Sequence, residues 1–140
     1  KILLFAFGND SGNPYLPFNH VRRSTVYTGT HDNDTVIGWW NNLLPEEKNR
    51  IAVQLESIQG HPPVDIQEDM LRFAFSSVSD WAIIPVQDIL GLDSSSRFNV
   101  PGTAEGNWAW RLTDYHGLRR EISKLRNRAK EFNRLSFRKN

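Results

Sequence analysis

Short apolar runs alternate with longer stretches of helical periodicity along the chain. Residues 2–7, 24–28 and 81–86 are rich in aliphatic, β-branched and aromatic side chains and end at turn formers, which is typical of short buried strands. Pro85 within the third run is unusual for a regular central strand. Alternation of such strands with helices predicts an α/β fold with a parallel sheet.

Three helices are predicted from their start and stop signals. Pro45 begins the first, with acidic residues behind it, and Gly60 breaks it. Asp65 is suited to cap the second helix, and the stretch 118–132 has the clear amphipathic spacing of a third. The second helix is expected to carry its apolar face on Ile66, Met70, Phe73 and Val78.

Polar, irregular segments follow each predicted strand. These are residues 8–19, 29–35 and 87–106. In parallel sheets, ligands bind at the carboxyl ends of the strands, so all three segments are expected to lie on the functional face. The densest group of reactive side chains is the run His31-Asp32-Asn33-Asp34 in the second segment.

The His31–Asp34 run supports several kinds of chemistry. Its carboxylates, imidazole and amide suit acid–base work, metal binding or hydrogen bonding to hydroxyl groups. The calcium-loop and zinc-protease patterns are both missing, so we predict neither a metal site nor a cofactor. The structural alternative is that Asp34, or less readily Asp32, only caps the helix that follows.

Aromatic side chains give a second signal. Sugar rings offer apolar faces and a rim of hydroxyls, so aromatic platforms beside Asp, Asn and His suit carbohydrate. Trp39 and Trp40 are expected to pack within the following helix, whereas Trp108, in a glycine-flanked loop, has the stronger functional claim.

Composition and charge narrow the classes of partner. The 140 residues contain no cysteine, which excludes disulfides and thiolate chemistry, and the net charge is only +1. The apolar runs are far shorter than the roughly 20 residues needed to span a bilayer. We therefore predict neither a membrane nor a nucleic-acid partner. The basic segment after residue 118 is interpreted as a solvated helix face, with nucleic-acid binding through Arg119, Arg126 and Arg134 as a minor alternative.

Several motif blocks resemble those of the 4-alpha-glucanotransferases, also called amylomaltases or disproportionating enzymes. The blocks are FAF at 5–7, NPYLP at 13–17, VYTGTHDNDT at 26–35, IPVQDILGL at 84–92 and PGTAEGNW at 101–108. They follow the family's order over nearly the whole chain.

The resemblance implies a (β/α)8 barrel that transfers α-1,4-glucan segments to glucose or maltooligosaccharide acceptors by a retaining mechanism. Asp32 matches the family's third catalytic carboxylate, which stabilises positive charge on the reacting sugar, and His31 would hydrogen-bond the same sugar. Asn107 matches a sugar-binding residue and Phe5 an aromatic residue near the cleavage point, and we include Trp108 among the substrate-binding residues.

The resembling region begins at about the family's sixth barrel strand. Residues 1–140 are therefore predicted to be the C-terminal part of the catalytic barrel, about its last three strand–helix units, without the nucleophile and the acid/base. The segment alone is expected to be inactive, with the rest of its own barrel and α-1,4-glucans as partners. The competing hypothesis is a non-catalytic α-glucan-binding module. The expected compartment is the bacterial cytoplasm, with a plastid as the alternative.

Overall fold

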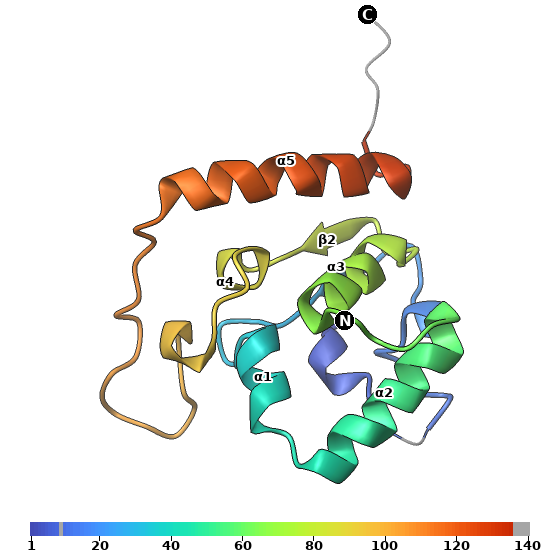
Figure 1. Ribbon diagram of the computed structural model, residues 1–140, viewed down its shortest axis with the longest axis horizontal. Coiled ribbons are helices and arrows are strands. Elements are labelled where there is room, and N and C mark those ends of the chain that lie inside the picture. Colours follow the sequence, from blue (N-terminus) through green and yellow to red (C-terminus); the bar gives the residue numbers. More distant parts are fainter. Residues whose placement is uncertain (9, 136–140) are drawn as a thin grey trace, which may run out of the picture.

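The computed structural model describes residues 1–8 and 10–135 (Figure 1). These described residues form two short strands, five α-helices of four to seventeen residues and three short 3₁₀ helices. Arg138 and Lys139, which belong to the predicted basic segment, lie outside the described residues. In chain order the elements are η1 (Leu3–Phe5), η2 (Pro17–Asn19), β1 (Thr25–Tyr27), α1 (Val36–Asn42), α2 (Pro45–Gln59), α3 (Ile66–Ser76), β2 (Trp81–Ile83), α4 (Val86–Ile89), η3 (Ser94–Ser96) and α5 (Tyr115–Glu131).

The two strands pair in parallel, as predicted. Thr25 lies opposite Trp81 and Tyr27 opposite Ile83, and helices α1, α2 and α3 form the crossover between the strands. On the other side of β1, Ile2 forms an isolated parallel bridge with Tyr27. Three segments of the chain therefore run side by side in the same direction.

The predicted strand over residues 2–7 is wrong beyond its first residues. After the bridge at Ile2 the chain turns into η1, and Ala6 donates its amide to the Leu3 carbonyl at 2.9 Å. Leu3, Leu4 and Ala6 are all buried. A continuously apolar run indicates that the segment is buried on every side, but it does not distinguish a strand from a tight helical turn.

The predicted strand over 81–86 is also shorter than expected. β2 ends at Ile83, and Pro85 stands at the N-cap of α4. Proline has no amide hydrogen to give to a sheet but is well suited to a helix start, which explains the early end. The expected loop over 87–106 consequently contains α4 and η3.

The predicted helix signals are confirmed at three places. Pro45 is the first residue of α2, which stops at Gly60 in the left-handed conformation (φ +83°). Asp65 caps α3 by accepting hydrogen bonds from the amides of Gln67 and Glu68. Val78 was expected on this helix, but α3 ends at Ser76 and Val78 is exposed.

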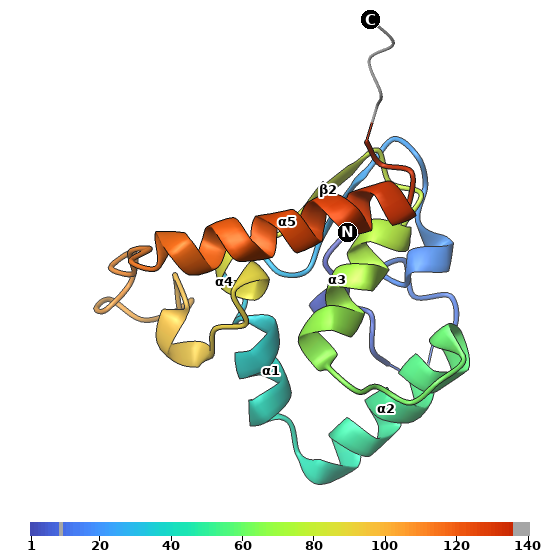
Figure 2. The same ribbon diagram turned by 45° about the horizontal axis from the view of Figure 1, so that its top comes forward.

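The core lies on one side of the strands. Figures 1 and 2 show α1, α2 and α3 gathered around η1 and the strands, with α5 lying across the molecule. Trp39 and Trp40 pack against this core, as predicted. On the opposite side of the sheet, Trp81 is 69% exposed and Ile83 is also exposed. The fully buried side chains of the core include Leu3, Val26, Val36, Leu55 and Met70.

Helix α5 is fastened to α3 through charged groups. Arg128 pairs with Glu68, and Arg72 of α3 lies 3.0 Å from Glu131. Arg134, just past the helix, donates to the carbonyls of Phe75 in the last turn of α3 and of Ser77 and Ser79 after it, the last at 3.0 Å.

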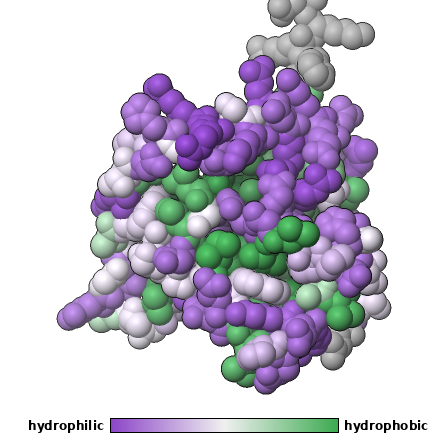
Figure 3. Space-filling view, in the orientation of Figure 1, coloured by the Kyte–Doolittle hydropathy of each residue, from purple (hydrophilic) through white to green (hydrophobic). Residues whose placement is uncertain are grey.

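The outer side of α5 is hydrophilic (Figure 3). Its Arg119 and Arg126 are exposed, in agreement with a solvated face, whereas Arg134 is engaged with backbone carbonyls. Among the helices that the structure describes, none has the length and apolar character to cross a bilayer.

Candidate functional site

His31 and Asp32 lie in the loop that leaves the carboxyl end of β1. Their side chains are 56% and 52% exposed, and His31 Nε2 lies 3.5 Å from Asp32 Oδ2. The imidazole and the carboxylate thus form an open polar pair at the end of the strand where α/β folds bind ligands.

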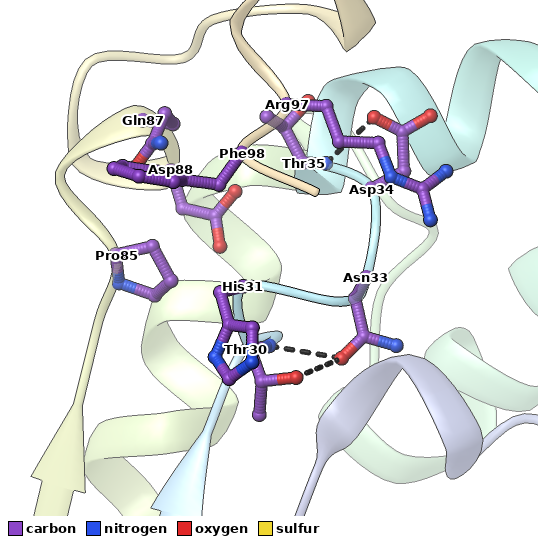
Figure 4. Close-up of a pocket in the computed structure, with 10 residues that line it drawn as sticks. All are labelled: Thr30, His31, Asn33, Asp34, Thr35, Pro85, Gln87, Asp88, Arg97 and Phe98. Carbon is purple, nitrogen blue, oxygen red and sulfur yellow. Dashed lines mark hydrogen bonds between the residues drawn. The ribbon is translucent and has the colours of Figure 1, made fainter. Parts of the chain in front are cut away.

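The rest of the loop holds itself in shape. Asn33 Oδ1 accepts hydrogen bonds from the amide and the hydroxyl of Thr30, both at 2.9 Å (Figure 4). The side-chain oxygen of Asn33 is thus used within this short turn, whereas the neighbouring His31 and Asp32 side chains remain exposed.

The helix after the loop is capped by Thr35. Its hydroxyl oxygen accepts the amide of Gly38 at 3.0 Å. Asp34, which the sequence suggested as the cap, instead accepts the Thr35 amide at 2.8 Å and the Ser94 hydroxyl at 2.7 Å. Asp34 therefore ties α1 to η3 and has a structural function.

Asp88 of α4 connects the two ends of the same loop through hydrogen bonds to its carboxylate. Its carboxylate accepts the Thr28 hydroxyl, before the loop, and the Val36 amide at 2.8 Å, after it. The side chain is 2% exposed, and burial raises the pKa of Asp88 above its usual value although both hydrogen bonds lower it.

The segment after η3 meets the His31–Asp32 pair from the other side. Asn99 donates its side-chain amide to Asp32 Oδ1 at 2.7 Å, and Arg97 donates to the Asp32 backbone carbonyl at 2.7 Å. No sequence motif marks either residue. The available signal was topological, because loops that follow neighbouring parallel strands meet at one edge of the sheet.

Trp108 lies over His31. The two ring centroids are 5.1 Å apart at 39°, and Phe98 contacts the indole edge-to-face at 5.5 Å. Trp108 adopts a left-handed backbone (φ +62°), which costs a residue other than glycine about 1 kcal/mol, and its amide donates to the Phe98 carbonyl at 2.7 Å. The fold thus holds a half-exposed indole beside the polar pair.

The other two predicted site residues differ in their placement. Phe5 shares a depression of about 400 Å³ with Asp32 and Arg97, and its exposed ring packs against Tyr15 at 5.6 Å. Asn107 instead bonds within its own loop, accepting the Val100 amide at 2.8 Å and donating to Thr103 at 3.0 Å. The geometry groups Phe5, His31, Asp32 and Trp108, while Asn107 shapes the loop that carries Trp108.

This arrangement suits binding of a polyhydroxylated ligand. A second depression of about 230 Å³ beside His31 is lined by Thr30, Asp88 and Arg97, so hydrogen-bonding groups surround the pair and aromatic rings flank it (Figure 4). Within residues 1–8 and 10–135, no three His, Cys, Asp or Glu side chains gather in a way that could hold a metal ion.

Comparison with known proteins points to one family. The family model described as 4-alpha-glucanotransferase matches residues 1–117. The chain is 47% identical to the chloroplastic/amyloplastic 4-alpha-glucanotransferase of Solanum tuberosum over 137 residues, which cover 96% of this chain and 23% of the potato protein. It is 43% identical to the 4-alpha-glucanotransferase of Thermus thermophilus over 116 residues, covering 80% of this chain and 23% of that protein. These relatives thus include a plastid and a bacterial enzyme.

A solved structure agrees with these matches. The amylomaltase of Streptococcus agalactiae in complex with acarbose superimposes with a TM-score of 0.82 at 34% identity, covering 96% of this chain and 27% of that one. The match confirms the predicted α/β class. The chain spans about a quarter of the length of these relatives. From the family match and these identities, the chain belongs to the 4-alpha-glucanotransferase family.

Proposed function

We propose that this chain supplies part of the active site of a retaining 4-alpha-glucanotransferase that transfers α-1,4-glucan segments to glucose or maltooligosaccharide acceptors. The observation that carries the proposal is the half-exposed Asp32 carboxylate, fixed through Oδ1 by Asn99 and flanked by His31 and Trp108. Membership in the family gives this geometry its chemical context.

In this proposal Asp32 acts on the reacting glucose. A retaining reaction breaks the donor glycosidic bond through a transition state in which the sugar ring carries positive charge. A carboxylate that binds the ring hydroxyls at fixed distance stabilises that charge more than it stabilises the neutral donor, which lowers the barrier. His31 donates a hydrogen bond to the same sugar, and Trp108 and Phe5 contact its apolar faces. Asn107, which matches a sugar-binding residue of the family, is also proposed to bind the sugar.

We also propose that residues 1–140 form about the last three strand–helix units of a (β/α)8 barrel, at its C-terminal end. Two observations support this. The first is that the segment at Ile2, strand β1 and strand β2 are parallel and lie side by side in chain order. The second is that Trp81 and Ile83, on one face of the sheet, are exposed. The nucleophile and the acid/base would come from the part of the protein upstream of Lys1.

The barrel proposal is tested by expressing residues 1–140 alone. The expected product lacks a cooperative unfolding transition as a monomer and does not disproportionate maltotriose, because its sheet face and edges are uncovered. A cooperatively folded, active monomer would refute the proposal.

The catalytic proposal is tested by Asp32→Asn in the complete protein that contains this chain. Turnover of maltotriose should fall by about 10² to 10³-fold, while binding of maltooligosaccharides measured by calorimetry is largely retained. Asp34→Asn is the matched control, since that carboxylate serves α1 and η3 and its loss should lower stability by about 1 kcal/mol without changing turnover comparably. Unchanged turnover in Asp32→Asn would favour the non-catalytic glucan-binding module.

A further inference from the structure

The segment that follows η3 braces the His31–Asp32 pair at three points. Arg97 donates from its guanidinium to the Asp32 carbonyl at 2.7 Å. Asn99 donates its backbone amide to the His31 carbonyl at 3.1 Å and its side-chain amide to Asp32 Oδ1 at 2.7 Å. Arg97 Nε also donates to the Asn99 carbonyl at 2.9 Å, so the brace is itself held together.

We propose that Asn99 is a positioning residue for the Asp32 carboxylate. The inference rests on the proposed function, in which that carboxylate faces the reacting sugar. Asp32 is half exposed, so its carboxylate would otherwise rotate among several orientations in solvent. The Asn99 bond to Oδ1 selects one of them and directs Oδ2 toward the open side beside His31.

The chemistry of the donor supports this function. An amide orients a carboxylate without cancelling its charge, whereas a lysine or arginine in the same place would form an ion pair that competes with a cationic transition state. Arg97 lies in the same segment and donates its Nε and Nη2 hydrogens to the backbone carbonyls of Asn99 and Asp32, not to the Asp32 carboxylate. The full negative charge of Asp32 is thereby kept available where positive charge develops.

Asn107 shows how an asparagine is placed when its side-chain hydrogen bonds stay within one loop. Its side-chain bonds reach Val100 and Thr103, residues of its own loop. The Asn99 side chain instead reaches a residue 67 positions away that belongs to the other loop of the site. Its side-chain bond therefore acts between loops, on the proposed reactive group.

The test compares Asn99→Ala and Asn99→Asp in the complete protein, with disproportionation of maltotriose as the assay. Loss of the donor should lower kcat by about 10 to 100-fold while KM changes little, because the oriented carboxylate matters most in the transition state. Asn42→Ala is the matched control, since Asn42 donates to the structural carboxylate of Asp34 at 3.3 Å.

Asn99→Asp adds a second measurement, the pH dependence of kcat, which a purely structural effect of the substitution would not change. The introduced group has almost the same volume as the amide, but when ionised it repels Asp32 and cannot donate. When protonated it can donate a hydrogen bond again. Relative to the unmodified protein, kcat of this variant should therefore recover as the pH falls, whereas kcat of Asn99→Ala should show no such recovery.

The outcomes separate this inference from the function on which it rests. Unchanged turnover in Asp32→Asn overturns the proposed function itself. Loss of turnover in Asp32→Asn together with normal kcat in both Asn99 variants overturns only the positioning of Asp32. A fall in kcat that follows a fall in melting temperature, with no pH-dependent recovery in Asn99→Asp, also overturns it. In the Asp32→Asn background, Asn99→Ala should produce no further loss.

Discussion

Two histidine-containing polar clusters lie at opposite ends of the same pair of strands. His31 and its neighbours follow the carboxyl end of β1. At the amino end, His20 lies 2.6 Å from the Ser77 hydroxyl through Nδ1, and Ser77 is linked through Ser79 to Ser24, which directly precedes β1. Each cluster contains a histidine among other polar groups, but the two differ in how much of their hydrogen-bonding capacity is already used.

The cluster at the amino end is closed. His20 is 6% exposed, its Nε2 donates to the Tyr15 carbonyl at 2.9 Å, and its Nδ1 is engaged with Ser77, so both ring nitrogens have protein partners. At the carboxyl end, the His31 and Asp32 side chains are about half exposed. A polar cluster thus becomes a candidate site through the hydrogen-bonding capacity that it leaves to a ligand.

The largest effects are expected when the histidine of each cluster is replaced by alanine. His20→Ala should lower the free energy of unfolding by about 3 kcal/mol, because it leaves the Tyr15 carbonyl and the Ser77 hydroxyl without their partner and opens a cavity. His31→Ala should change stability by less than about 0.5 kcal/mol but lower maltotriose turnover at least about tenfold. Chemical denaturation and kinetics of the complete protein measure both. A destabilised His31→Ala variant with normal specific activity would reverse the assignment.

A second prediction compares two carboxylates at the carboxyl end. Asp88→Ala should cost about 2 kcal/mol of stability, since the Thr28 hydroxyl and the buried Val36 amide lose their acceptor. Asp88→Asn should cost much less, because it keeps an oxygen for Val36 and removes a buried carboxyl whose pKa is raised by burial. Asp32→Asn shows the opposite preference, with little effect on stability and a large effect on turnover. Equal losses of stability in Asp88→Asn and Asp88→Ala would mean that the charge of Asp88 is required.

The features that could be predicted from the sequence are those that depend on residues close together in the chain. The run His31-Asp32 stands directly after a β-branched strand, and the position of α2 is set by Pro45 and Gly60, so these features depend on residues close together in the chain. The resemblance to the family then selected Asp32 within the run. Local signals of this kind are sufficient for a helix boundary or for a loop at the end of a strand.

The closed cluster and the brace depend on distant residues. His20 lies 57 positions from Ser77, and Asn99 lies 67 positions from Asp32, with no periodic pattern to connect either pair. The same limitation produced the wrong strand at 2–7, because burial of Leu3 and Leu4 depends on helices formed much later in the chain. Such contacts are determined by tertiary packing, which local propensity does not encode.

The smallest expected effect is the pH dependence of the closed cluster. Burial lowers the pKa of His20 below its usual 6.5, while the hydrogen bond to the Tyr15 carbonyl opposes this shift and the positive charge of Lys1 adds to it. As the pH falls below 6.5, the unfolded chain binds a proton that the folded protein resists, so His20 makes folding less favourable, by at most about 1.4 kcal/mol per pH unit. Denaturation midpoints between about pH 7.5 and pH 5 should therefore decline less steeply in His20→Gln than in the unmodified protein, after each is referred to its own value at the higher pH. An identical decline in both proteins would show that His20 stays neutral or charged alike in the folded and unfolded states, and the amino-end cluster would then be closed by packing alone.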